Sequence, residues 1–257
     1  MNINFECTTC GKCCHDLRLP LCVDEALTWL DRGGDVQIIC EAVPWPEEPP
    51  SEDLQAAAKH RRSFPAISGT LPTRIMVILA GVFTGACPNL QPDMRCGIYE
   101  ERPLVCRIYP AEISPFIELV PTRKACPPEA WTTARAPLMR EGKLVDSAIA
   151  SIAQRFRVVD EADVKTKQWL CSYLQIDAAA WSNEGYVLYS PERKLLRMML
   201  QQAKRASEPP PPSTNWRYVS NRRSTVEMFL SVDADSVLAE EIASESFEYL
   251  GLFGATS

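Results

Sequence analysis

Cysteine is the residue type in this chain whose number and spacing could do chemistry. The 257-residue sequence contains eleven cysteines, and ten of them lie in its first half. Four fall within one short stretch, which reads Cys7-Thr-Thr-Cys10-Gly11-Lys-Cys13-Cys14. A Cys-x-x-Cys step brings two sulfur atoms to one side of a tight turn, the separation that a tetrahedral metal ion needs for two of its ligands. Gly11 permits the positive-φ turn within this stretch. The spacing therefore favours metal binding.

The neighbouring pair Cys13 and Cys14 complicates a site with one ion. Adjacent side chains diverge in most backbone conformations, so one tetrahedral ion is not expected to bind both. Two neighbouring metal sites, or one polynuclear cluster, accommodate them better. Four more cysteines follow much later in the chain, at Cys87, Cys96, Cys106 and Cys126. Together the two groups supply eight sulfurs, the number for two four-thiolate sites, but the spacing does not say which sulfurs share an ion.

All-thiolate coordination suits either zinc or an iron–sulfur cluster, and the sequence does not separate the two. The remaining cysteines, Cys22, Cys40 and Cys171, are expected to pack in the core as small apolar side chains. His15 and Asp16 directly follow the first group and fit an outer hydrogen-bonding role better than direct ligation, because eight thiols already suffice. Arg102, Arg107 and Lys12 could offset the negative charge of a thiolate-rich site or form ordinary surface ion pairs.

The composition argues against nucleic-acid-binding and membrane-spanning proteins. With 27 basic and 33 acidic residues, the formal net charge is −6, which argues against a broad nucleic-acid-binding face. The longest apolar run, Ile75 to Ala86, is too short to cross a bilayer, and the N-terminus lacks a signal-peptide apolar region. We therefore expect a cytoplasmic protein with neither a nucleic acid nor a membrane as partner. In that compartment thiols stay reduced, which makes disulfides a poor interpretation of the clustered cysteines.

The first half, residues 1–136, is rich in proline and glycine and should be built of turns and short elements. Its pattern predicts helices over residues 24–32 and 51–62 and buried strands over 74–83 and 116–120. Pro103 is expected to start a short helix that carries Cys106. We predict an α+β fold whose first half is a loop-rich, metal-stapled domain with short strands and helices.

After residue 137 the apolar residues repeat with a helical period, most clearly from Leu144 to Phe156. Further helices are expected from a cap at Asp160, from Ser190-Pro191 to Ala206, and from Asp233 to Leu252, with one or two short strands in 216–232. Four prolines, Pro209 to Pro212, should form a stiff spacer. Residues 137–257 are thus predicted to be a second, mainly α-helical region, which packs on the first or recruits a protein partner.

The cysteine motifs also carry a family resemblance. Cys7-x-x-Cys10-Gly-x-Cys13-Cys14, then Cys87-Pro-Asn-Leu, then the run from Arg95-Cys96 to Cys106-Arg107-Ile-Tyr-Pro110 resemble the YkgJ-type cysteine-cluster (CxxCxxCC) family. Its members are regarded as zinc- or iron-chelating proteins and are similar to a region of the flagellin lysine methylases. The resemblance covers about residues 5–130 and implies nothing about the rest. It implies metal ligation by Cys7, Cys10, Cys13, Cys14, Cys87, Cys96, Cys106 and Cys126.

Taken together, the sequence predicts a cytoplasmic protein that chelates iron, in one form as an iron–sulfur cluster, or zinc. Two alternatives stay open: an iron–sulfur-dependent enzyme of redox or methyl-transfer chemistry, and a zinc-stapled interaction module without catalysis. No catalytic residue can be assigned.

Overall fold

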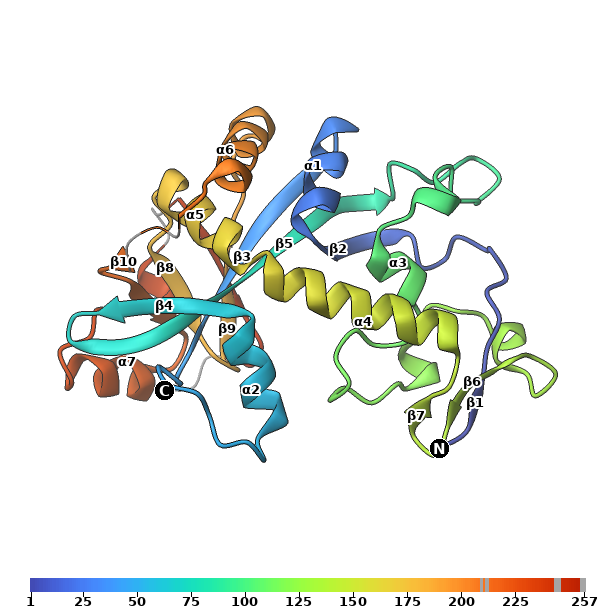
Figure 1. The fold of residues 1–257 in the computed structure, drawn as a ribbon, viewed down its shortest axis with the longest axis horizontal. Coiled ribbons are helices and arrows are strands. Elements are labelled where there is room, and N and C mark those ends of the chain that lie inside the picture. The colour runs from blue at the N-terminus through green and yellow to red at the C-terminus, as the bar shows by residue number, and fades with distance from the viewer. Residues whose placement is uncertain (209, 211–212, 243–245, 255–257) are drawn as a thin grey trace.

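The computed structural model describes residues 1–208, 210, 213–242 and 246–254, and Figure 1 shows their arrangement. Most of the predicted proline spacer, Pro209–Pro212, lies outside these residues. The long strand β5 (Leu71–Ala86) lies at the centre of the strand pairing in the first half of the chain. It pairs antiparallel with β2 (His15–Leu21), β3 (Asp35–Val43) and β4 (Ser63–Ser68). Its β-branched, apolar sequence suits a buried strand, and the strand predicted over 74–83 is confirmed.

Strands from the second half of the chain extend the same sheet. They are β8 (Ala178–Trp181), β9 (Gly185–Tyr189), β10 (Ser213–Thr214), β11 (Arg217–Ser220), β12 (Ser236–Leu238) and β13 (Glu248–Gly251). β3 pairs in parallel with β8 and antiparallel with β9, and β10 pairs with β4. Within the described residues the result is a ten-stranded sheet built from both halves of the sequence.

The prediction of a mainly α-helical C-terminal half is therefore wrong, although the fold is α+β. The strand β8 has the sequence Ala-Ala-Ala-Trp, and alanine has the highest helix propensity, yet pairing with β3 and β11 in a buried sheet overrides it. In place of the helix expected from Asp233 to Leu252, the described residues form β12, a short 3₁₀ turn and β13, and residues 243–245 of that range lie outside the described residues. The prediction that this half recruits a protein partner assumed a helical surface. It stays a prediction without that support.

The helices are α1 (Val23–Asp31), α2 (Leu54–Arg61), α3 (Leu104–Ile108), α4 (Ser147–Ala162), α5 (Val164–Leu174), α6 (Arg193–Arg205) and α7 (Arg223–Leu230). Both helices predicted in residues 24–62 are confirmed. Of the one or two short strands expected in 216–232, β11 is present, and α7 follows it. Residues 116–120 form a loop where a strand was predicted. Asp160 lies inside α4, and Asp163 takes the expected cap position before α5.

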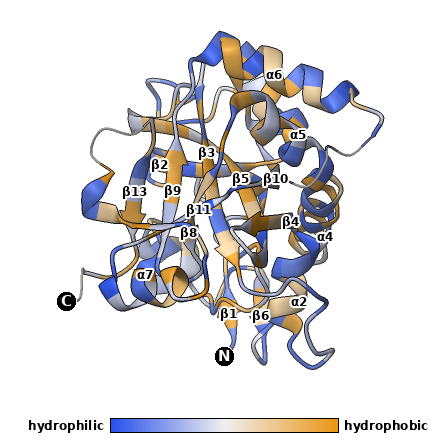
Figure 2. Cartoon of the chain, turned by 90° about the vertical axis from the view of Figure 1, so that its left-hand side faces the viewer, coloured by the Kyte–Doolittle hydropathy of each residue, from blue (hydrophilic) through white to orange (hydrophobic). Residues whose placement is uncertain are grey.

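The main core lies where α1, α5 and α6 pack on the sheet. Figure 2 shows hydrophobic colour along central strands such as β5 and β9, whereas α6 carries both hydrophobic and hydrophilic residues. None of the described helices has the length and apolar character that a membrane crossing requires.

A second, smaller sheet lies apart from the first, at the end of the molecule that contains the N-terminus (Figure 1). It consists of β1 (Ile3–Asn4), β6 (Pro137–Arg140) and β7 (Lys143–Leu144). Helix α4 runs from the side of the large sheet toward it. Since β1 pairs with β6, the first residues of the chain are held against residues just beyond 136. The division into domains 1–136 and 137–257 stays a prediction.

Candidate metal centre

The eight candidate cysteines lie in loops and one short helix on the side of the molecule where α3 lies (Figure 1). The first group precedes β2, and Cys87 directly follows β5. Because His15 of β2 pairs with Ala86 of β5, the ends of these strands bring the two groups together. The backbone N–H of Cys87 donates a hydrogen bond of 2.8 Å to the carbonyl of Cys14. The antiparallel pairing of β2 and β5 thus joins segments that are far apart in sequence.

Cys96 is held near Cys87 by the folding of their shared loop. Leu90 donates a backbone hydrogen bond of 2.8 Å to the carbonyl of Cys87 and forms an isolated β-bridge with Cys96. The N–H of Gly97 closes the same loop through a bond of 2.7 Å to the carbonyl of Asn89. These bonds fix the Cys87–Cys96 loop as one compact unit without a regular helix or strand.

Cys106 lies in α3, the short helix that the sequence predicted after Pro103. The carboxylate of Glu25 anchors this helix, since it accepts the N–H of Leu104 at 2.6 Å and the N–H of Cys22 at 3.0 Å. Glu25 therefore ties α3 to the start of α1 on the large sheet. No local pattern predicts this role, because Glu25 and Leu104 are 79 residues apart.

Cys126 lies close to the start of the chain. The N–H of Glu6 donates to the carbonyl of Ala130 at 3.0 Å, and the indole of Trp131 donates to the carbonyl of Cys126 at 3.3 Å. The rings of Phe5 and Trp131 pack with centroids 4.8 Å apart. The segment around residues 126–131 is thus fastened next to the residues that precede Cys7.

Gly11 makes the turn of the Cys-x-x-Cys stretch, with φ of +67°. A Cβ atom there would approach the carbonyl oxygen of Met94 to 2.5 Å. The predicted positive-φ turn is confirmed, and both backbone conformation and space favour glycine. The turn is closed by the N–H of Cys14, which donates to the carbonyl of Gly11 at 2.9 Å.

The thiols of Cys13 and Cys14 interact directly. A hydrogen bond from Cys14, a backbone hydrogen bond and the charge of Arg102 together lower the pKa of Cys13 to about 7, against the effect of burial. The same bond, burial and the negative charges of Cys13, Cys87 and Cys106 raise the pKa of Cys14 well above its ordinary value. One thiol of the pair is therefore readily ionised, and the other holds its proton.

Burial is the main cause that raises the pKa of the other affected thiols. Burial and the charge of Cys87 raise the pKa of Cys106 to about 12, and the charge of Arg102 opposes this increase. Burial also raises the pKa of Cys87, to which the charges of Cys96 and Cys13 contribute. Thiolates that are partly buried and close together repel one another. A bound cation would stabilise their negative charges.

At Cys126, burial raises the pKa to about 11, partly offset by a hydrogen bond from the Tyr109 hydroxyl. The charges of Cys13, Cys7 and Cys10 raise it further. The Tyr109 hydroxyl also accepts the N–H of Ala125 at 2.8 Å. The position of Tyr109 shortly after Cys106 does not by itself predict that it supports Cys126.

The candidate thiols gather in one region without surrounding a common point. Among the described residues, no group of three or more Cys, His, Asp or Glu side chains is placed as a metal ion would need them. Cys7 is exposed, and the other seven candidates are partly exposed. Coordination would thus require rotations of these accessible side chains. The donor set itself, eight thiols with little competing oxygen or imidazole, fits zinc or an iron–sulfur cluster.

The structure also places the other residues that the sequence analysis singled out. Cys22, Cys40 and Cys171 are buried in apolar clusters, as predicted. The carboxylate of Asp16 accepts the N–H of Gly85 at 2.6 Å, a bond that supports the strand ends. Arg102 lies 3.5 Å from the ring centroid of Tyr99, and its charge acts on Cys13 and Cys106, in agreement with the charge-compensating role.

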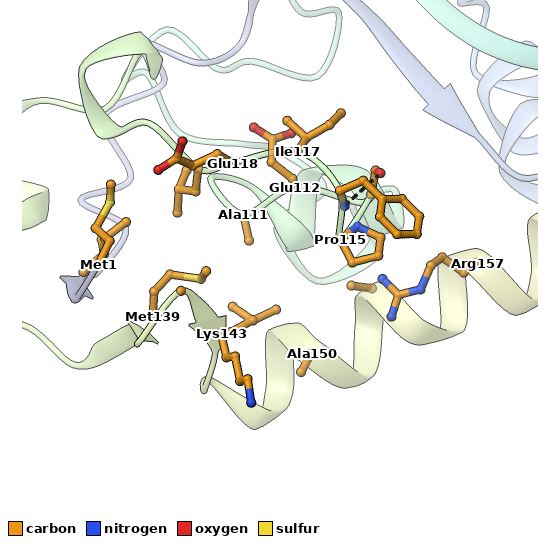
Figure 3. Close-up of a pocket in the computed structure, with 17 residues that line it drawn as sticks. Met1, Ala111, Glu112, Pro115, Ile117, Glu118, Met139, Lys143, Ala150 and Arg157 are labelled. Atoms are coloured by element: carbon orange, nitrogen blue, oxygen red, sulfur yellow. Dashed lines mark hydrogen bonds between the residues drawn. The ribbon is translucent and has the colours of Figure 1, made fainter. Parts of the chain in front are cut away.

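A cavity of about 550 Å³ lies beside this region, and Figure 3 shows its lining. It is enclosed by the loop of residues 111–119, by β6 and β7, and by α4. Its wall is mainly apolar, with Glu112, Glu118, Lys143 and Arg157 as its charged members. No cysteine lines this cavity, so it is separate from the candidate metal centre.

Comparison with known proteins gives one match. Residues 6–127 match the family model CxxCxxCC, described as "Putative zinc- or iron-chelating domain". All eight candidate cysteines fall within the matched residues. No curated protein and no solved structure matches the chain.

Proposed function

We propose that the chain, whose residues 6–127 match the family model described as "Putative zinc- or iron-chelating domain", binds iron or zinc through clustered cysteine thiolates. The proposed ligands are Cys7, Cys10, Cys13, Cys14, Cys87, Cys96, Cys106 and Cys126. One observation carries the proposal: the pairing of β2 with β5 and the hydrogen bond from the N–H of Cys87 to the carbonyl of Cys14 bring together cysteine-bearing segments that are far apart in sequence.

The acid–base properties of the thiols support a cation as their partner. A metal ion binds the thiolate, so each bound thiol releases its proton. Burial and mutual repulsion hold several of these pKa values above neutrality, which leaves the thiols protonated until a cation stabilises the charge. Arg102 supplies a fixed positive charge near Cys13 and Cys106 that would offset part of the excess negative charge.

A bound metal would also stabilise a region that has little apolar core of its own. Between β5 and β6, the described residues form short 3₁₀ turns, the short helix α3 and loops. In zinc-finger peptides, structural zinc binding is worth roughly 10–16 kcal/mol. An ion that joins Cys126 or Cys106 to the N-terminal segment would tie these loops together.

Purification of the full chain without oxygen, followed by metal quantification and a visible spectrum, tests the proposal. Bound iron–sulfur should give a brown protein with visible absorbance, and bound zinc should give a colourless one. A Cys10→Ser, Cys106→Ser double variant should lose metal, whereas Cys171→Ala should keep it. Wild-type protein with no more bound metal than the double variant would overturn the proposal.

The same measurements separate the finer alternatives. An iron–sulfur cluster would support electron transfer or methyl-transfer chemistry, and zinc alone would support a structural module. We propose a cytoplasmic location, because thiols that bind a metal must stay reduced and cytoplasmic conditions keep thiols reduced. Fractionation of cells that produce the chain, with antibody detection in each fraction, tests this location.

A further inference from the structure

The cavity of about 550 Å³ beside the candidate metal centre has the size and lining of a separate binding site. We propose that it binds a small amphipathic anion, which is a molecule with an apolar body and one carboxylate or phosphate group. This inference goes beyond the proposed metal binding and does not depend on it, because none of the described cysteines lines the cavity.

The cavity lies between two small apolar clusters and is lined by members of both. Ile3 and Leu119 belong to one cluster. Ala111 and Ala153 belong to the other, and together with Ala150 they give the wall small side chains that leave space between α4 and the facing loop. Protein interiors are normally packed as densely as organic crystals, so an apolar space of this kind is uncommon. Its volume falls in the range of roughly 300–1,000 Å³ that small-molecule sites occupy.

The loop of residues 111–119 also exposes apolar side chains at the cavity. Phe116 is 42% exposed and Ile117 is 57% exposed, and both line the cavity. Exposed apolar side chains that gather beside a hollow often mark a binding site. An apolar body bound there would remove these side chains from water, which is favourable. The loop can therefore cover the apolar part of a ligand.

The charged residues of the lining favour a negatively charged ligand. The carboxylate of Glu112 is already paired with the ammonium group of Lys124. Arg157 donates hydrogen bonds to the carbonyl of Ile113 at 2.9 Å and to the side-chain oxygen of Gln154 at 2.8 Å. Neither acceptor carries a charge, and within the described part of the chain no carboxylate pairs with Arg157. Its guanidinium is thus held in place and keeps a positive charge that an anion could neutralise.

Figure 3 shows where the charges lie around the cavity. Arg157 extends from α4 toward Pro115. The carboxylates of Glu112 and Glu118 lie on the opposite side, away from α4. An anionic group beside Arg157 would therefore avoid both carboxylates, and its apolar body would lie along Ala150 of α4. The planar guanidinium has N–H groups beyond the two bonds that hold it, and their geometry suits the oxygens of a carboxylate or a phosphate.

Binding of simple probes to the full chain tests the proposal. Calorimetry compares decanoate, decyl phosphate, decanol and acetate, each below the concentration at which it forms micelles. We expect at least one of the two long-chain anions to bind about tenfold more tightly than decanol, and acetate to bind more weakly than either. The tighter of the two anions identifies carboxylate or phosphate as the preferred group. Binding of neither anion, or binding of decanol as tightly as both, would overturn the proposal.

Substitutions on α4 locate the site. Arg157→Gln should weaken binding of the preferred anion by about tenfold and leave decanol binding unchanged. Arg155→Gln removes the same charge from an exposed position of the same helix that does not line the cavity, and it is the matched control. Ala150→Phe should fill the cavity and abolish binding of both probes. Equal weakening by the two arginine variants, or undiminished binding to Ala150→Phe, would overturn the proposal.

A second measurement avoids variants that fail to fold. Wild type is irradiated with a diazirine analogue of the preferred anion, and the labelled peptides are mapped by mass spectrometry. The expected labels lie in residues 111–119 and 139–157, and an excess of the unmodified anion should suppress them. Labels that lie mainly elsewhere, or that the excess does not suppress, would contradict the site.

Discussion

The large sheet and the cysteine-bearing region obtain their order in different ways. Strands such as β5 and β3 bury Ile75, Leu79 and Ile38 completely, and α1, α5 and α6 cover them. The cysteine-bearing region, residues 5–14 and 87–131, has only small apolar clusters around Leu104, Ile108 and Leu119. Its loops are fixed mainly by single backbone hydrogen bonds, and its candidate thiols are exposed or partly exposed.

This difference separates the source of stability from the proposed source of function. A buried apolar sheet is stable through the area it removes from water, whatever ligand is present. Loops that carry metal ligands gain their order when the metal binds, because binding free energy is then also folding free energy. The cysteine-bearing region should therefore respond strongly to metal, and the sheet should not.

Removal of metal is expected to give the largest effect. Treatment of loaded protein with a strong chelator should expose the backbone amides of residues 87–131 to rapid hydrogen exchange, since roughly 10–16 kcal/mol of binding energy is lost in comparable zinc peptides. Amides of β3 and β5 should keep their protection. Hydrogen exchange with mass spectrometry, with and without chelator, measures both regions in one experiment. Equal loss of protection in both would show that the regions are not independent.

Acid should weaken metal binding by the next largest amount. The pKa values of Cys106 and Cys126 are raised to about 12 and about 11, so these thiols are protonated at neutral pH and must release protons to bind. Each released proton changes the binding free energy by about 1.4 kcal/mol per pH unit. Affinity should therefore fall by more than tenfold for each unit from pH 8 to pH 6. Competition with a metal-sensitive dye at each pH measures it, and a flat profile would contradict thiolate ligation.

Truncation of a side chain in the core of the large sheet should lower stability without changing metal binding. Leu79 is fully buried in β5 between β2 and β3, and Leu79→Ala should lower the free energy of unfolding by about 3 kcal/mol. The number of bound metal ions should stay unchanged where the variant is folded. Chemical denaturation gives the first quantity and elemental analysis the second. Ile117→Ala, an exposed side chain in the loop of residues 111–119, is the control and should change stability by less than about 0.5 kcal/mol.

The same contrast explains which parts of the protein the sequence could predict. Local sequence signals predicted several features correctly. They are the turn at Gly11, the short helix after Pro103 and the apolar strand from Arg74 to Phe83, and the spacing of the thiols is a local signal of the same kind. The pairing of β3 with β8 and β9 joins residues more than 100 positions apart, and no periodicity reports such a contact. An alanine-rich strand and two short edge strands were consequently missed. The assignment of the eight cysteines as ligands, and the boundary after residue 136, stay predictions.

A buried ion pair joins α4 to α5 and to the end of α2, and its removal should give the smallest of these effects. Asp160 in α4 accepts hydrogen bonds from Lys167 in α5 and Arg62 after α2, with Asp160 3% and Lys167 2% exposed. Burial raises the pKa of Asp160, but the two cations outweigh it and leave the pKa below its usual value. Lys167→Met should cost about 2 kcal/mol, less than the usual loss for a broken buried pair, because Arg62 still faces the carboxylate.

The pH dependence identifies the ion pair as the cause. A carboxylate whose pKa is depressed by folding contributes stability at pH values above its unfolded pKa of about 3.9, and that contribution is lost as pH falls through the lower folded pKa. The stability difference between wild type and Lys167→Met should therefore be largest near neutral pH and shrink below about pH 4. Urea unfolding of both proteins across this range measures it, with Lys165→Met on the same helix as the control. A difference that persists undiminished in acid would assign the loss to packing of the Lys167 side chain and not to its ion pair with Asp160.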